Sequence, residues 1–406
     1  MDEAVSDAPR KPGFAAVPRR VRWLILANVP ASLAFGYLIV LVTAYLPEIG
    51  VSSGDVGVMF GAMGLAMVVS AVPLGMYSDR RGRKWLLIVA AGALPPSLLA
   101  FGLTTDVLPL VVASVALGIG DGAFLTTWNA IIADQTTVEE RDAAFSLSFV
   151  LGNVSMGAGL LLPVALPWLQ DATGVDSRTV HLSLMGILAL ASGITAVAAW
   201  ILLRDYRETV RPKGTRTKLR ALKPLVKFSG LNSLIGLGAG FIIPLVPTWL
   251  LLKHGVPDAY SGPLLAVSNL TIGLAGIVSA SLSRRFGPVR AIVMTQGLST
   301  VFMLAMVPSP TALIAGSVYV VRAALMNMAS PLLDSFLMGI VPKDQRGVAS
   351  AVNSLVWRLP NSVTTVIGGL LLAAGSYDLP IFLATSFYVV AIAGFYLVFR
   401  TVRPTE

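Results

Sequence analysis

Long apolar stretches, separated by short polar and basic segments, occupy most of the chain. A helix needs about 20 apolar residues to cross the ~30 Å hydrocarbon layer of a bilayer. The alternation of apolar and polar positions that marks membrane strands is absent, which argues against a β-barrel. The pattern predicts an all-α membrane protein with twelve transmembrane helices, at residues 23–46, 54–77, 84–104, 108–132, 143–168, 180–203, 229–252, 260–283, 289–307, 311–338, 347–374 and 379–400.

The composition agrees with this pattern. Of 406 residues, 55% are hydrophobic and only 13% are charged, whereas a soluble domain carries about 25% charged residues. The net charge of +9 is better explained by basic residues that flank membrane spans than by a nucleic-acid partner. The absence of cysteine excludes disulfides, thiolate catalysis and cysteine-bound metals.

Basic residues fall on one side of the twelve-helix arrangement. They precede the first span, follow the last, and occupy the loops after spans two, four, six, eight and ten; residues 204–227 alone contain nine of them. The opposite loops contain only Arg178 and Lys253. Because cytoplasmic loops carry the excess of lysine and arginine, both termini are expected in the cytosol. The predicted location is the cytoplasmic (inner) membrane, crossed many times.

The sequence also repeats itself weakly at an offset of 205 residues. Gly57 then coincides with Gly262, and Arg141 with Arg346. Since each half has an even number of spans, the halves are parallel copies, with solute sites near the midplane between them. The expected organisation is a tail at 1–22, a six-helix bundle at 23–203, a linker at 204–228, a second bundle at 229–400 and a tail at 401–406.

The loop between spans two and three carries a specific motif. Residues 75–84 read Gly-Met-Tyr-Ser-Asp-Arg-Arg-Gly-Arg-Lys. Gly75 would allow close contact between helices, and Gly82 a tight turn. This motif resembles the signature cytoplasmic loop of the major facilitator superfamily. The resemblance implies two pseudo-symmetric six-helix bundles and secondary active transport by alternating access. It also implies a cytoplasmic gate, in which Asp79 and Arg83 belong to a charge cluster that latches the halves when that side is shut, with Asp134 and Arg141 close by. The expected gate residues are Gly75, Asp79, Arg80, Gly82, Arg83, Asp134 and Arg141.

Within that superfamily, the spacing of Gly57, Gly61 and Gly64 followed by Pro73-Leu-Gly75 resembles the drug/proton antiporters. Two departures count against proton-driven export. Span five is rich in glycine but lacks the Gly-Pro pair of those proteins. Ser114 stands about where they carry a basic residue early in span four.

Away from the ends of the predicted spans, four charged residues lie at bilayer depth: Asp121, Arg322, Asp334 and Arg358. A charge at the centre of a bilayer costs ~2.5–3.5 kcal/mol even on a lenient scale, so each is a functional candidate. A central Asp121 favours coupling to protons, because desolvation stabilises the protonated carboxyl. A cavity arginine favours an anionic solute, which it can bind through two hydrogen bonds. Alternatively, Asp334 forms a structural ion pair with Arg322 or Arg358.

Several uncharged residues are weaker candidates. Trp128 and Asn129 follow Asp121 by two helical turns and share its face. Further side chains either bind solute or bond a neighbouring helix. His181 and His254 are expected to be solvated at extracellular span edges, and neither a metal site nor a cofactor is expected. The remaining candidates for solute or coupling are Asn28, Tyr37, Asn232, Trp249, Asn269 and Asn327.

Enzymatic functions find no support in the sequence. It lacks the Gly-x4-Gly-Lys-Ser/Thr loop that cradles ATP phosphates, and two peripheral histidines cannot assemble a Ser–His–Asp site. The leading hypothesis is proton-coupled efflux of a small amphipathic molecule, with Asp121 carrying the proton. The alternatives are uptake or exchange of an organic anion held by Arg322 or Arg358, and a receptor that does not transport. We expect a monomer in the lipid bilayer whose partners are a small-molecule solute and protons.

Overall fold

The computed structural model describes residues 17–206, 222–342 and 345–402, leaving aside the side chains at 79–81, 138–139, 142, 272–277, 280 and 347. Helices account for nearly all of these residues, and no strand occurs among them. The first half comprises α1 (Arg19–Ala27), α2 (Val29–Val40), the π-helical turn η2 (Leu41–Tyr45), α3 (Leu46–Glu48), α4 (Ser53–Arg81), α5 (Lys84–Leu103), α6 (Val107–Asp134), α7 (Val138–Leu161), η3 (Leu162–Ala165), α8 (Leu166–Thr173) and α9 (Ser177–Leu202). The second half comprises α10 (Leu222–Gly240), η4 (Ile243–Leu245), α11 (Val246–His254), α12 (Asp258–Phe286), α13 (Pro288–Ala305), α14 (Ala312–Ile340), α15 (Arg346–Ala373) and α16 (Leu379–Phe399).

The predicted spans correspond to these helices one by one. In the described part of the chain, eleven helical segments are long and apolar enough to cross a membrane. The 29-residue helix α12 occupies the place of the remaining predicted span. The all-α membrane fold is therefore confirmed. The helices often start earlier or end later than predicted: α1 begins at Arg19 and α10 at Leu222. Arginine and lysine are good helix formers, so a helix continues past its apolar stretch into basic sequence.

Proline divides three spans into segments rather than ending them. Helix α2 restarts at Val29-Pro30, η3 has Pro163 near its start, and α11 has Pro247 in its first turn. Proline lacks a backbone N–H and fits the first turn of a helix, where that donor would have no partner. The first, fifth and seventh spans consequently consist of several shorter helical segments. In the first span, α2 is followed by η2, a π-helical turn.

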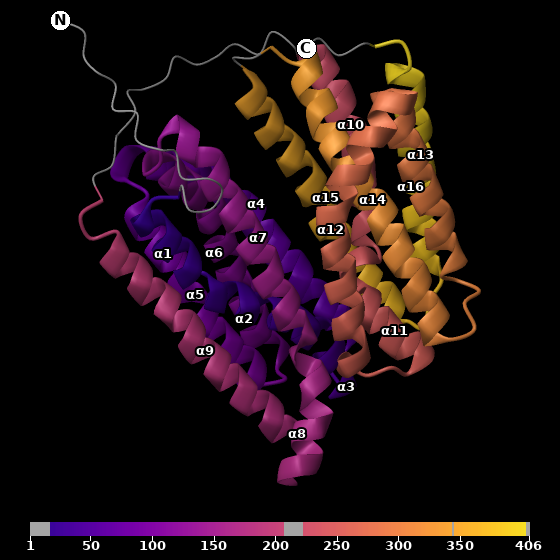
Figure 1. The fold of residues 1–406 in the computed structure, drawn as a ribbon. Coiled ribbons are helices and arrows are strands. Elements are labelled where there is room, and N and C mark those ends of the chain that lie inside the picture. Colours follow the sequence, from indigo (N-terminus) through magenta and orange to yellow (C-terminus); the bar gives the residue numbers. More distant parts are fainter. Residues whose placement is uncertain (1–16, 207–221, 343–344, 403–406) are drawn as a thin grey trace, which may run out of the picture.

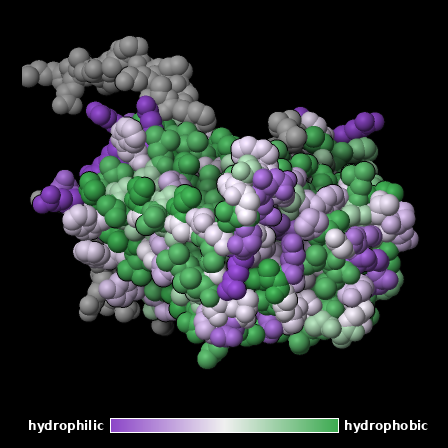
Figure 2. Space-filling model, turned by 90° about the horizontal axis from the view of Figure 1, so that it is seen from below, coloured by the Kyte–Doolittle hydropathy of each residue, from purple (hydrophilic) through white to green (hydrophobic). Residues whose placement is uncertain are grey.

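The helices form two groups that diverge at one end of the molecule (Figure 1). We call the end at which α1 begins and α16 finishes the tail end, and the opposite end the loop end. The halves touch mainly through α4 with α15 and α7 with α12. Viewed from the loop end, the surface shows no open mouth between the halves, and hydrophilic residues gather along its middle (Figure 2). The halves are thus closed at the loop end and apart at the tail end.

The contacts between the halves repeat at the offset found in the sequence. A Cβ added at Gly57 would lie 2.8 Å from the carbonyl oxygen of Thr365. The residues 205 positions away, Gly262 and Leu160, form the equivalent contact, in which a Cβ on Gly262 would collide with the Leu160 carbonyl. One contact joins α4 to α15 and the other joins α12 to α7. These reciprocal contacts relate the halves by a pseudo-twofold axis, as expected for a duplication of parallel copies.

Candidate functional site

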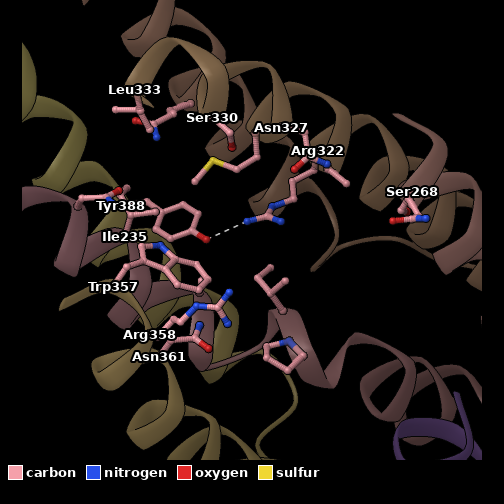
Figure 3. A pocket seen from close by; sticks show the side chains of 18 of the residues that line it. Ile235, Ser268, Arg322, Asn327, Ser330, Leu333, Trp357, Arg358, Asn361 and Tyr388 are labelled. Carbon is pink, nitrogen blue, oxygen red and sulfur yellow. Dashed lines mark hydrogen bonds between the residues drawn. The ribbon is translucent and has the colours of Figure 1, made fainter. Parts of the chain in front are cut away.

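A cavity of about 690 Å³ lies between the halves. The second half supplies most of its wall, from α10, α12, α13, α14, α15 and α16. The first half contributes only the apolar side chains of Ile39, Met156 and Leu160. The cavity is therefore asymmetric, because its polar side chains come from the second half. Figure 3 shows several of them around the cavity.

Arg322 is the most deeply buried charge of this cavity, with 4% of its surface exposed. Its Nη2 donates a hydrogen bond of 2.8 Å to the hydroxyl of Tyr388 (Figure 3). The guanidinium also lies 5.7 Å from the centre of the Tyr388 ring, within the range of a cation–π interaction. The Nε atom has no hydrogen-bond partner. The arginine is thus held in place by one residue and keeps a donor for another ligand.

Asp334 lines the same cavity without pairing with an arginine. Among the described residues, neither Arg322 nor Arg358 lies within 4 Å of its carboxylate, so the structural ion pair considered from the sequence is absent. Asp334 and Arg322 are twelve residues apart on α14, a separation of ~18 Å along the helix axis. Arg358 instead faces α4, with Nη1 3.6 Å from Sδ of Met67.

Amide side chains form much of the polar wall and also connect helices. Nδ2 of Asn232 donates to Oδ1 of Asn353 at 3.1 Å, across α10 and α15. Nδ2 of Asn269 donates to the carbonyl of Asn153 at 3.2 Å, across the two halves. Asn327 also lines the cavity. Three of the polar residues predicted as solute ligands, Asn232, Asn269 and Asn327, are therefore brought together here.

Sequence reasoning missed other residues of this wall. For those on α14 and α15, the signal is the recurrence of polar residues every three to four positions, the spacing of one helical face. The missed polar and aromatic lining residues are Ser268, Gln296, Tyr319, Ser330, Asn353, Ser354, Trp357, Asn361 and Tyr388.

A second, smaller cavity of about 130 Å³ contains Asp121 of α6, with Gly64 and Met67 of α4 and Arg358 of α15. The charge of Arg358 acts on Asp121, although in the described structure the two are not within ion-pair distance. Arg358 lines both cavities, and so do Trp357 and Asn361. One cation therefore faces the large cavity and Asp121 at once.

Five predicted ligands line neither of these two cavities. Nε1 of Trp128 donates to Oγ of Ser148 at 2.9 Å inside the first half. Helix α6 packs on α4 and on α7. Asp121 and Trp128 share one face of α6, but Asp121 lies beside α4 and Trp128 beside α7. The other four are an exposed Asn129, Asn28 bonded to Ser32, Tyr37 bonded to His181, and Trp249 bonded to the Tyr377 carbonyl.

At the tail end, Asp134 binds two side chains of the first half. It accepts hydrogen bonds from Arg83 and, at 2.6 Å, from the hydroxyl of Tyr206. Burial lowers the pKa of Arg83 and the Asp134 carboxylate raises it, with a net increase. Burial, and next the bond to Asp134, raise the pKa of Tyr206 well above its ordinary value. The predicted gate residues Arg83 and Asp134 are therefore in contact, within one half.

The other gate residues give a mixed result. Arg141 donates to the carbonyl of Ala133 at 3.1 Å. Gly82 has φ of 104°, which confirms the turn that needs glycine. The close helix contact predicted at Gly75 is wrong, because among the described atoms an added Cβ would meet only Thr126, at the ordinary contact distance of 3.8 Å. The predicted roles of Asp79 and Arg80 lie outside the described side chains.

The prediction that His181 is solvated is wrong. Only 2% of its surface is exposed, and its Nδ1 is 2.7 Å from the hydroxyl of Tyr37. Its ring stacks on that of Tyr45, with centroids 3.6 Å apart. The first span covers the imidazole through Tyr37 and Tyr45, and Asp258 of the second half lies 3.6 Å from its Nε2. His254 is partly buried too, with its ring edge-on to Trp249.

Comparison with known proteins agrees with this arrangement of helices. A sequence profile described as Major Facilitator Superfamily matches residues 24–359 and, in a second match, 228–406. The chain belongs to the Major Facilitator Superfamily. As a superfamily member with this fold, it is a multi-pass membrane transporter.

Two relatives within the Major Facilitator Superfamily carry functional names. The multidrug resistance protein MdtG of Dickeya zeae is 25% identical over 287 residues, covering 67% of this chain and 68% of that protein. Multidrug resistance protein 1 of Bacillus subtilis is 25% identical over 387 residues, covering 91% of this chain and 94% of that protein. The predicted similarity to the drug/proton antiporter branch is confirmed at the level of these relatives.

A solved structure matches the fold over nearly the whole chain. It is a bacterial homologue of the human lysosomal transporter Spinster, in an inward-facing and occupied conformation. The TM-score is 0.76 at 17% identity, over 97% of this chain and 98% of that one. At this identity the likeness concerns the fold alone.

Proposed function

We propose that this transporter exports a small organic solute in exchange for protons, by alternating access. The observation that carries the proposal is the position of Arg358, which lines both the large cavity and the small cavity of Asp121. The names of the two relatives, both multidrug resistance proteins, support the direction of transport.

The exchange follows from competition for Arg358. A solute that fills the large cavity pushes the guanidinium toward Asp121. A nearby positive charge favours the ionised carboxylate, so Asp121 releases its proton. When the solute leaves, Arg358 moves back and Asp121 regains a proton. The solute and the proton thus replace each other.

The wall of the large cavity fits a small amphipathic molecule. Met326, Leu333 and Trp357 offer apolar surface beside the amides. Ligand pockets typically combine such surface with a few polar groups that fix orientation. Neutral molecules with an aromatic ring and hydrogen-bonding groups are the class of solute that this wall favours.

The placement in the membrane completes the proposal. We infer that the tail end faces the cytosol, because basic residues concentrate there, and that the membrane is the cytoplasmic one. The bundles at 23–203 and 229–400, joined by 204–228, are the bodies that rock. The gate residues around Arg83 and Asp134 would then shut the cytosolic side, and the protein works as a monomer.

Flux into proteoliposomes tests the exchange. Chloramphenicol is a suitable neutral amphipathic probe, and pH gradients of each sign are imposed. An opposing proton gradient is expected to accelerate probe movement, and reversing the gradient should reverse the net direction. If neither sign alters the flux of a probe that the protein does carry, proton exchange is ruled out.

Uptake or exchange of an organic anion is the second candidate function, favoured by the unpartnered Nε of buried Arg322. An anion would draw Arg358 away from Asp121 and leave that carboxyl to take up a proton, so the two would move together. Fluorescein is the probe for this candidate. Hydrogen bonds to charged groups contribute about 1.5–3 kcal/mol.

Arg322→Gln and Arg358→Gln should therefore each weaken fluorescein binding about tenfold or more. Arg400→Gln, an exposed position at the end of α16, is the matched control. Calorimetric titration of the purified variants measures the affinities. Unchanged binding in both cavity variants would remove the basis of the anion candidate.

A further inference from the structure

A buried cluster at the loop end joins the two halves away from both cavities. His181 of α9 lies between Tyr37 and Tyr45 of the first span. Its Nε2 is 3.6 Å from Oδ2 of Asp258, the first residue of α12 in the second half. Tyr37 can donate its hydroxyl proton to Nδ1, which leaves Nε2 to carry a proton toward Asp258. The geometry therefore provides a proton-binding site between the halves, formed by His181 and Asp258.

Asp258 lies in the first turn of α12, where the backbone N–H of Ala259 hydrogen-bonds with its carboxylate. It is 7% exposed, and its Oδ2 has no hydrogen-bond partner. Glu48 of α3 acts on Asp258 with a like charge. Arg178 and Asp176, at the start of α9, act on Tyr45 with opposite signs. Among the described residues, His181 is thus the side chain placed to supply Asp258 with a compensating charge in the closed state.

We propose that His181 and Asp258 form a proton-binding latch that holds the loop end closed. This inference rests on the alternating access of the proposed function. A charge left buried without its partner is strongly destabilising. Closing the loop end without a proton would bury the Asp258 carboxylate beside a neutral imidazole. Closing with one proton creates either an imidazolium–carboxylate pair or a neutral pair, and both are tolerated.

The proton of the latch gates transport but does not cross the membrane. When the loop end opens, α12 carries Asp258 away from α9, and both groups become hydrated. An ordinary histidine then releases its proton near neutral pH, on the same side from which the proton came. The latch is therefore separate from Asp121, and acidity on the loop-end side favours the closed loop end.

A second bond across the halves lies beside the latch. The hydroxyl of Thr248 donates to the carbonyl of Thr43, which lies 205 residues earlier. Thr43 belongs to η2, the π-helical turn that also carries Tyr45. Such turns occur frequently at functional sites. The turn thus couples the ring that stacks on His181 to the contact surface between the halves.

Spin labels across the loop end test the latch. The chain contains no cysteine, so Thr105→Cys and Pro310→Cys introduce the only labelling sites. Both positions are exposed, and they lie on equivalent loops of the two halves. In nanodiscs, a short distance between the two labels marks the closed loop end and should dominate at about pH 5. The population with a long distance, which marks the open loop end, should increase at about pH 8, since histidine titrates in this range. One linked proton changes the open-to-closed ratio by up to about tenfold per pH unit.

Variants separate the latch from other causes. Asp258→Asn removes the buried charge, so the short distance should persist at both pH values. His181→Gln should favour the long distance near neutral pH, and the double variant should restore the short one. Asp121→Asn should leave the pH dependence of the distance intact, which keeps this test independent of proton exchange. A native protein without pH dependence, or an Asp258→Asn protein with the native dependence, would overturn the latch.

Discussion

Replacing Asp121 with asparagine is expected to abolish the accumulation of chloramphenicol that a pH gradient drives. A gradient of about one pH unit supplies about 1.4 kcal/mol, so one-for-one exchange concentrates the probe about tenfold. Asparagine keeps the size of the side chain and cannot exchange a proton. The large cavity does not include Asp121, so exchange of probe without a gradient should continue. Accumulation and gradient-free exchange are measured with radiolabelled probe in the same proteoliposomes.

Asp334→Asn is the matched control for this experiment. Asp334 is also an intramembrane carboxyl, but it lines the large cavity only, without Arg358 in ion-pair distance. Its loss should leave the tenfold accumulation largely intact. If Asp121→Asn still accumulates the probe and Asp334→Asn does not, the coupling proton resides on α14 and the competition for Arg358 is wrong.

The sequence predicted the fold because hydropathy is a local property. Each apolar stretch reports its own span, and the basic loops and the offset of 205 constrain how the spans are arranged. The ends of helices were less predictable. Arg19 and Leu222 start helices inside segments assigned to a tail and a linker, since helix propensity extends beyond the bilayer core.

The site was only partly predictable. The cost of a charge in lipid identifies residues that need a cavity, and the structure places Asp121, Arg322 and Arg358 in cavities. An aromatic residue with a polar group does not need a cavity, because its hydroxyl or indole N–H can form a hydrogen bond inside the protein core. Trp249 does so, with Nε1 bonded to the Tyr377 carbonyl.

His181 shows the limit of sequence reasoning most clearly. Its place at a span edge indicated a solvated residue, yet its ring packs against Tyr37 and Tyr45 of the first span and lies beside Asp258 of the other half of the chain. No local pattern contains that contact. Long-range partners of this kind decide whether a polar side chain binds solvent, solute or protein.

The second prediction with a large expected effect concerns a glycine at the contact between α4 and α15. Gly57→Ala is expected to separate the halves at the loop end. The added Cβ would lie 2.8 Å from the Thr365 carbonyl oxygen and 2.9 Å from Cα of Gly369, and backbone atoms cannot rotate away. Overpacking a well-packed contact costs about 1–3 kcal/mol. Because this contact lies between two bodies, the halves can part instead of unfolding, so the label pair at 105 and 310 should shift to its long distance at every pH.

Two glycines inside the first half provide the comparison that decides this interpretation. Gly118→Ala would place a Cβ against the Met63 carbonyl inside one bundle, where the two helices cannot move apart. The stability of this variant should therefore fall by about 1–3 kcal/mol, and the distance between the labels at 105 and 310 should stay unchanged. Gly92, with no atom within 4 Å of an added Cβ, should tolerate alanine in both measurements. If Gly57→Ala instead lowers the melting temperature as Gly118→Ala does and keeps the short distance, then the α4–α15 contact belongs to a rigid core. The halves would then not separate at the loop end, and alternating access about this contact would be excluded.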